Sequence, residues 1–429
     1  MDSPKSPPGS VRRHGRNISH PILRRSTKGP LDAADDPLAG APASPSVLSP
    51  PEISSPTVSA EVQQAISTLP EPALAHRPKA NVDLTFLQDP SIYHTLPTED
   101  VAPPFIESEQ RPPPGTPLAD LLQHGHFRRA ADRAAYDLVQ CAPNDAEGLL
   151  QLLYTRLACL ILISRPDLAA QEAASLSDLL ARNPPVAKDI VPLIPWELRL
   201  LLVRLQSIGA TDGGRRGIMA LYGLAAEVRA TLKQDNDDEV LRDVWPGRLR
   251  DLGLRVADAL VEMGELETAN RHLETLTDAD EEEIAYRRAL LRIRVGDVTG
   301  ARICVNSMRD ESRKATFEVL LKVADGDFSD AADSWQDMDE QGPDYALIAN
   351  NLAVCMLYTG HITSSRRILE DASAQLPGFS GLLFNLSTVY ELCTERAIHL
   401  KAELAQTMAA KTPQPDTSGW EKTTLDFKL

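Results

Sequence analysis

The sequence predicts an all-α protein in which antiparallel pairs of helices stack into a solenoid, preceded by a disordered tail rich in proline and serine. A short motif recurs four times in the C-terminal half: a glycine, a polar residue, an apolar residue and then small residues that open an apolar-periodic run. Prolines are concentrated ahead of these motifs, since 22 of the 33 lie at or before Pro117. Because proline disrupts a helix interior, the helices are expected to follow this point.

The four motifs have the spacing of a known helical repeat. They read GELETA from Gly264, GDVTGA from Gly296, GDFSDA from Gly326 and GHITSS from Gly360. The intervals are 32 (296 − 264), 30 (326 − 296) and 34 (360 − 326), which bracket the 34-residue period of tetratricopeptide (TPR) repeats. A glycine lets the chain leave the first helix of each pair in a left-handed turn without steric cost. We therefore predict TPR-like hairpins that turn at these four glycines.

A small residue follows each turn glycine at the fifth position. It is Ala269, Ala301 or Ala331 in the first three copies and Ser365 in the last. This position lies early in the second helix, where the two helices of a hairpin are expected to approach most closely. A serine is tolerated there if its hydroxyl bonds back to its own helix.

A fifth, isolated copy extends the repeat towards the N-terminus. GHFRRA begins at Gly125, which lies 139 residues before Gly264, roughly four repeat lengths upstream. The intervening segment is therefore predicted to form degenerate helical hairpins. The predicted organisation is a disordered low-complexity tail (1–80), an extended, proline-punctuated strap (81–115), the TPR-like solenoid (116–411) and a short polar tail (412–429).

Composition restricts the classes of partner and compartment. The formal net charge of −17 argues against nucleic acid as the main partner, although residues 1–30 carry seven Lys or Arg against one Asp. The five cysteines are scattered singly, which indicates a reducing compartment rather than disulfides or a zinc site. No apolar run reaches the roughly 18 residues of a membrane span. We expect a cytoplasmic protein whose membrane contact is peripheral.

Catalytic motifs are not found in the sequence. It contains no HExxH, GxSxG, Walker or dinucleotide-binding pattern. His124 and His126 are the nearest approach to a metal pair, but they flank a predicted turn and have no further ligand nearby. We therefore predict no enzymatic activity, cofactor or metal. Asn350 and Asn351 lie on the kind of helix from which some TPR domains build a clamp for C-terminal carboxylates, but the companion lysines do not recur at repeat spacing.

Longer segments resemble one family. The run LLFNLSTVYELCTERAIHLKAEL, Leu382 to Leu404, is followed by a polar stretch that ends in FKL. Further similarities occur in order: GHFRRA at Gly125, LYTRLACL from Leu153, VWPGRLRDLGLRVADAL from Val244 and NNLAVCMLYTGHI from Asn350. Together they cover about residues 85–429 and resemble the family of the twelfth subunit of the trafficking protein particle (TRAPP) complex.

The resemblance implies a scaffold. Members of this family are accessory subunits of a tethering complex in transport between endoplasmic reticulum and Golgi and in autophagy, and the core of that complex activates a Rab GTPase. The implied partners are other TRAPP subunits, chiefly the large accessory ones, with the Rab protein reached only through the complex. The implied location is the cytoplasm, with peripheral association with Golgi and ER–Golgi membranes through the complex. The alternative is a freestanding TPR adaptor or co-chaperone that binds peptide tails.

The last predicted unit carries the candidate partner-binding residues. Phe384, Leu386, Tyr390 and Leu392 are apolar or aromatic where an ordinary solenoid presents a polar cap. Two interpretations remain open for them: they pack onto the preceding hairpin, or part of the set is exposed and contacts a partner.

Overall fold

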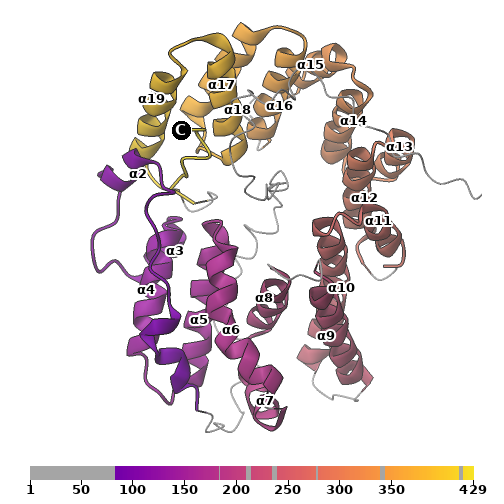
Figure 1. Cartoon of the computed structure of the whole chain (residues 1–429). Coiled ribbons are helices and arrows are strands. Elements are labelled where there is room, and N and C mark those ends of the chain that lie inside the picture. The colour runs from indigo at the N-terminus through magenta and orange to yellow at the C-terminus, as the bar shows by residue number, and fades with distance from the viewer. Residues whose placement is uncertain are drawn as a thin grey trace, which may run out of the picture. The chain divides into compact units, whose positions relative to one another are not determined.

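Helices follow one another along most of the described chain, which confirms the predicted all-α class of stacked TPR-like hairpins (Figure 1). The computed structural model describes residues 83–182, 184–208, 214–233, 239–276, 279–338, 344–414 and 419–429. All of them fall within one of the two compact units into which the chain divides, and only that unit is considered below. The predicted tail, 1–80, lies outside the described residues. The boundaries predicted at residues 80, 115 and 411 stay predictions.

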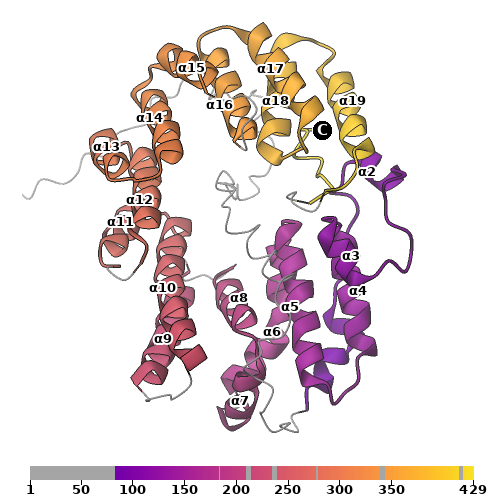
Figure 2. The same cartoon turned by 180° about the vertical axis from the view of Figure 1, so that it is seen from behind.

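The elements succeed one another in a simple order. Two 3₁₀ helices, η2 (Thr85–Gln88) and η3 (Pro90–Ile92), and a short helix α2 (Pro103–Glu107) precede the array. The array itself consists of α3 (Leu118–Gln123), α4 (Phe127–Gln140), α5 (Ala146–Leu162), α6 (Pro166–Arg182), α7 (Pro184–Ile190), η4 (Val191–Leu193), α8 (Trp196–Ser207), α9 (Arg215–Lys233), α10 (Glu239–Glu262), α11 (Leu266–Glu274), α12 (Glu281–Val295), α13 (Val298–Asn306), α14 (Glu311–Asp325), α15 (Phe328–Gln336), α16 (Tyr345–Tyr358), α17 (Ile362–Gln375), α18 (Ser380–Cys393) and α19 (Ala397–Ala410). Consecutive helices are in contact from α3 to α7 and from α8 to α19, α6 contacts α8, and α2 lies beside α19 in both views (Figures 1 and 2).

The five motif glycines all adopt the left-handed conformation. Their φ angles are 70° at Gly125, 79° at Gly264, 86° at Gly296, 88° at Gly326 and 84° at Gly360. In each turn the amide after the glycine donates to the carbonyl five residues earlier, for example Asp297 N to Arg292 O at 2.8 Å. This six-to-one hydrogen bond satisfies a carbonyl at the helix end. The glycine is therefore required by the backbone and not by any side-chain contact.

The small residues after the turns are fully buried. Ala269, Ala301 and Ala331 have no exposed surface, and neither has Ser365. The expected hydrogen bond from Ser365 back to its own helix is not formed, because its Oγ has no partner among the described residues. The position requires a small side chain. Burying the Ser365 hydroxyl without a hydrogen bond costs free energy, and no polar contact in the described residues offsets that cost.

A sixth turn of the same kind joins α5 to α6, without a glycine. Ser164 has a φ of 58°, and Arg165 N donates to Leu160 O at 2.8 Å. Ala169, five residues after Ser164, is fully buried, as in the other copies. The degenerate hairpins predicted between Gly125 and Gly264 thus include one that keeps the turn geometry with a different residue.

The segment ahead of the array lies along its first helices. Leu84 and Leu87 are fully buried and pack in the cluster formed by α5, α6 and α8. Gln88 Nε2 donates to the carbonyl of Cys141 at 2.7 Å, at the end of α4. Farther along, Ser108 Oγ donates to the carbonyl of Ala409 at 2.6 Å, in the last turn of α19. This segment therefore contacts both the first and the last helices of the array, and we call residues 83–115 the strap.

The turn geometry yields the first prediction. Gly326→Ala is expected to lower the free energy of unfolding by about 1 kcal/mol, because a side chain at φ 88° is strained even where nothing lies within 4 Å of the new Cβ. Gly223→Ala is the matched control: this glycine lies inside α9 with the same open space, so alanine should be neutral or stabilising by roughly 0.5–1 kcal/mol. Urea denaturation of both variants measures the difference. Equal effects of the two substitutions would contradict the turn argument.

Candidate functional site

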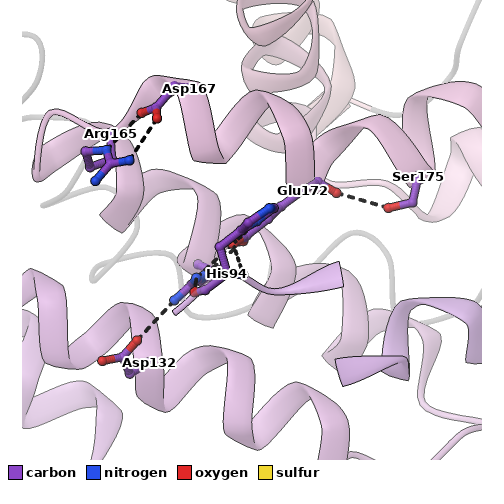
Figure 3. Close-up of polar contacts among 7 residues, drawn as sticks. His94, Asp132, Arg165, Asp167, Glu172 and Ser175 are labelled. Carbon is purple, nitrogen blue, oxygen red and sulfur yellow. Dashed lines mark hydrogen bonds and ion pairs between the residues drawn. The ribbon is translucent and has the colours of Figure 1, made fainter. Parts of the chain in front are cut away.

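A buried ion pair lies between α5 and α6 (Figure 3). Arg156 and Glu172 are almost completely buried, and the Nε and Nη2 atoms of Arg156 donate to Oε2 and Oε1 of Glu172 at 2.9 and 2.8 Å. This two-pronged geometry is the strongest that a guanidinium and a carboxylate form. Removing both charges from water is expensive, so such a pair is stable only when its other donors and acceptors are also satisfied.

The strap and α4 supply those remaining bonds. Arg156 Nη2 also donates to the carbonyl of His94 at 2.7 Å, and the backbone N–H of His94 donates to Glu172 Oε1 at 2.9 Å. Arg156 Nη1 donates to Asp132 Oδ1 on α4 at 3.3 Å. Figure 3 shows His94 and Asp132 reaching this centre from different elements. These four residues, called the charge anchor below, fix the strap and three helices to one another.

The residues after α19 connect the strap with the first hairpin. Ala102 N donates to Lys422 O at 3.0 Å and Thr424 N to Asp100 O at 2.9 Å, on either side of an antiparallel bridge between Val101 and Thr423. Trp420 N donates to the carbonyl of the turn glycine Gly125 at 3.0 Å. We call residues 419–429 the clasp.

Aromatic side chains bury the clasp. Phe105 of α2 lies edge-on to Trp420, with ring centroids 5.3 Å apart, and its ring is 6.2 Å from that of Phe427. All three rings are buried. On α19, buried Lys401 donates to the carbonyl of Lys428 at 3.0 Å. The segment predicted as a short polar tail thus contains core residues, because its few aromatic side chains meet partners that are remote in sequence.

His126 is held in its neutral form beside the clasp. Its ring lies 5.1 Å from that of Trp420, only 5% of the residue is exposed, and its Nδ1 has no hydrogen-bond partner among the described residues. Burial, together with the smaller effects of the neighbouring His124 and Arg129, lowers the pKa of His126 to about 4. The predicted solvated turn holds for His124, which is exposed, but not for His126.

The four candidate partner-binding residues fall on two sides of α18. Leu386 and Tyr390 are buried in the core formed with α16, α17 and α19, and burial raises the pKa of the Tyr390 hydroxyl. Phe384 and Leu392 are 48% and 57% exposed. In this fold only Phe384 and Leu392 are available to a partner.

Two leucines of the clasp are also exposed. Leu425 is 79% exposed and Leu429 is 49% exposed. Between them Lys428 places its Nζ 5.2 Å from the centre of the Phe384 ring. We call Phe384, Leu392, Leu425 and Leu429 the terminal apolar surface. The sequence analysis missed the two clasp leucines because it assigned their segment to a polar tail.

The asparagine clamp is partly occupied by an internal contact. Asn385 Nδ2 of α18 donates to Asn350 Oδ1 of α16 at 2.9 Å. Within the described residues there is no group of three or more histidine, cysteine, aspartate or glutamate side chains arranged to hold a metal. None of the helices in the described ranges combines the length and hydrophobicity of a membrane span.

Similarity to known proteins agrees with the family indicated by the sequence. A 300-residue stretch, 61% of this chain, is 24% identical to trafficking protein particle complex subunit 12 of Mus musculus and covers 37% of that protein. A 95-residue stretch, 21% of the chain, is 34% identical to the Homo sapiens subunit 12 and covers 13% of it. The chain is a distant homologue of these proteins. It spans little more than a third of the mouse relative, and no protein-family model matches it.

Two solved structures show a weaker likeness to this chain. The assembly chaperone of RpL4 (Acl4) is 16% identical with a TM-score of 0.30, covering 66% of this chain and 96% of that one. The TPR domain of P58(IPK) is 14% identical with a TM-score of 0.20, covering 70% of this chain and 93% of that one.

Removing one partner of the charge anchor is expected to cause a large loss of stability. Glu172→Ala should lower the free energy of unfolding by about 3–5 kcal/mol, because it leaves the Arg156 guanidinium buried without its counter-charge. Glu267→Ala is the control, since Glu267 pairs with Arg271 on the surface of α11 and is 81% exposed. That substitution should change the free energy by less than about 0.5 kcal/mol. Chemical denaturation distinguishes the two, and a loss below about 1 kcal/mol at Glu172 would refute the anchoring role.

The neutral His126 predicts acid sensitivity. Its pKa of about 4 lies below the value near 6.5 expected in the unfolded chain, so the unfolded state takes up the proton first. The resulting stability is fully present above pH 6.5 and is lost as the pH falls from 6.5 towards 4, by up to about 3 kcal/mol. His126→Gln, which does not titrate, should remove this part of the pH dependence. Unfolding free energies at pH 7.5 and 5.0 test it, because Glu421, whose pKa is raised by burial, is present in both proteins and its contribution cancels in the difference.

Proposed function

We propose that this chain is a non-enzymatic scaffold subunit of a TRAPP-type tethering assembly. The observation that carries the proposal is the 24% identity over 300 residues to mouse trafficking protein particle complex subunit 12. The architecture is of the right kind, because stacked helical hairpins present extended surfaces that hold partners. Since the chain spans 37% of that relative, the proposal concerns the helical part that the two share.

The proposed role is accessory. The chain contacts other subunits, chiefly the large accessory ones, and supports Rab activation by the core of the complex without touching the GTPase itself. It acts in ER–Golgi transport and autophagy, and it reaches Golgi membranes through the assembly. The terminal apolar surface is the proposed contact, because exposed aromatic and aliphatic side chains on the last unit of an array mark a place where another protein packs.

The alternative, a freestanding adaptor for peptide tails, has less support. A carboxylate clamp needs free asparagine and lysine side chains on the inner helices, whereas Asn350 already accepts a hydrogen bond from Asn385. The two functions differ in an observable way. A scaffold subunit is recovered in a large particle at near-equal amounts with its neighbours, and an adaptor is recovered mostly alone.

Native affinity purification of the tagged chain tests the proposal, with size-exclusion chromatography and mass spectrometry of the peak. The wild-type chain should co-elute with TRAPP subunits in near-stoichiometric amounts. In a variant with Phe384→Ser, Leu392→Ser and Leu425→Ser, the amount of co-purified subunits should fall at least about tenfold. Each apolar side chain buried at an interface contributes roughly 1.5–3 kcal/mol to binding.

The control replaces an equally exposed apolar residue elsewhere. Ile303→Ser alters a 66% exposed side chain on α13 and should leave co-purification unchanged. Unaltered melting temperatures would show that both variants keep the fold. A lone wild-type peak, or one that contains chaperones or assorted peptides, would overturn the scaffold proposal. Intact assembly by the triple variant would show that the partner binds another surface.

A further inference from the structure

A depression of about 380 Å³ lies where the strap meets α4. Its walls are formed by Arg111 and Gly115 of the strap, by Thr116 immediately after it, and by Arg129, Asp132 and Arg133 of α4. Three guanidinium groups and one carboxylate thus line the same hollow. In a chain of net charge −17 this is a local excess of positive charge, and we call it the arginine pocket.

The only carboxylate in the pocket lining is already occupied. Asp132 Oδ1 accepts a hydrogen bond from the buried Arg156 at 3.3 Å, and within the described residues it forms no ion pair with the pocket arginines. Arg133 is also committed, since its Nε lies 2.8 Å from Asp137 one turn farther along α4. Arg111 uses Nη1 to donate to the carbonyl of Ile106 at 3.2 Å. Its other guanidinium donors are not used by that bond.

Arg129 differs from the other two arginines in its hydrogen bonding. It makes no hydrogen bond and no ion pair with any residue in the described ranges, although it is half-buried at the start of a well-packed helix. A guanidinium carries five donors in a planar fork that matches a carboxylate or a phosphate. Burial raises the pKa values of the nearby Asp132 and Glu421 carboxyls and the charge of Arg129 helps to lower them, but neither carboxylate pairs directly with the Arg129 guanidinium. The pocket therefore contains donors that the described chain does not satisfy.

The walls of the pocket are set before any ligand arrives. Thr116 Oγ1 donates to the carbonyl of Pro113 at 2.8 Å, which holds the loop of the strap, and buried Leu121 forms part of the floor. Gly115 has a φ of 89° with nothing within 4 Å of an added Cβ, so the backbone leaves the mouth of the pocket open. A preformed cationic hollow loses little entropy when it binds its ligand.

We propose that the arginine pocket binds an acidic side chain, a carboxylate or a phosphate, on an extended segment of a partner protein. Arg129 makes the two-pronged contact and Arg111 contributes a second positive charge. A protein segment is favoured over nucleic acid or an anionic membrane, because a chain of net charge −17 repels long polyanions, whereas a single oxyanion experiences mainly the local arginines. This proposal rests on the pocket itself and does not require the trafficking assignment.

Fluorescence anisotropy with labelled peptides tests the proposal on the full chain. The probes are a short glutamate-rich peptide, its glutamine counterpart and its phosphoserine counterpart, with inorganic phosphate as a competitor. The glutamate and phosphoserine peptides should bind and the glutamine peptide should not. Arg129→Gln should weaken binding about tenfold, and Arg129→Lys should have an intermediate effect because it keeps the charge and loses the fork.

The matched control removes an arginine from another place. Arg294→Gln alters an exposed arginine in the last turn of α12 and changes the net charge equally, so it should bind the peptides as the wild type does. Unchanged affinity in Arg129→Gln, or equal binding of the glutamine peptide, would overturn the proposal. Binding of free phosphate as tightly as the phosphoserine peptide would also overturn it, because the pocket would then be a site for a small anion and not for a protein segment.

Discussion

The Arg156–Glu172 pair is the constraint on which the arrangement around the first helices depends. Beyond its two direct bonds, the pair between α5 and α6 has further donors and an acceptor lone pair, which the backbone of His94 and the carboxylate of Asp132 satisfy. Because an unpaired buried charge is far more expensive than any single apolar contact, the strap is held to one position. Asp132 also lines the arginine pocket, so one carboxylate belongs both to the anchor that holds the strap and to the pocket beside it.

The repeating part of the fold was predictable because each turn is local. A left-handed residue, a six-to-one hydrogen bond and a small residue five positions on lie within a few residues of one another, so the sequence carries the whole signal. The turn at Ser164 was missed because the motif was defined by its glycine. It has the hydrogen bond from Arg165 to Leu160 and the buried Ala169, but its left-handed residue is a serine, and a search based on glycine does not find it.

The candidate site was predictable only in part, because burial on α18 depends on which helices surround it. With about 3.6 residues per turn, Phe384 and Leu386 point in directions roughly 200° apart, so they do not share a face. Leu386 and Tyr390 are four residues apart and do share one, and the structure buries both. The helical periodicity therefore predicts that the four residues divide between two faces of α18. It does not predict which of these faces is buried in the core. The clasp had no such signal, since Trp420 and Phe427 stand among threonines, lysines and aspartates and are buried by Phe105, which is remote in sequence.

The clasp gives the protein a physical link between its two candidate surfaces. At one end Glu421 lies 3.4 Å from the Nε of Arg128, the residue next to Arg129 of the pocket, and burial raises the pKa of this carboxyl while Arg128 opposes the increase. At the other end Lys428 lies over Phe384, and both Lys428 and the buried Lys401 bond to Glu391, which lowers the pKa of that glutamate. The Arg128–Glu421 pair has limited exposure to water, where charges are screened less than on an open surface, whereas Glu391 at the other end is exposed. The segment is thus positioned by electrostatics at its ends and by aromatic burial in its middle. The strap is held in the same way, by the charge anchor at one end and by Phe105 at the other.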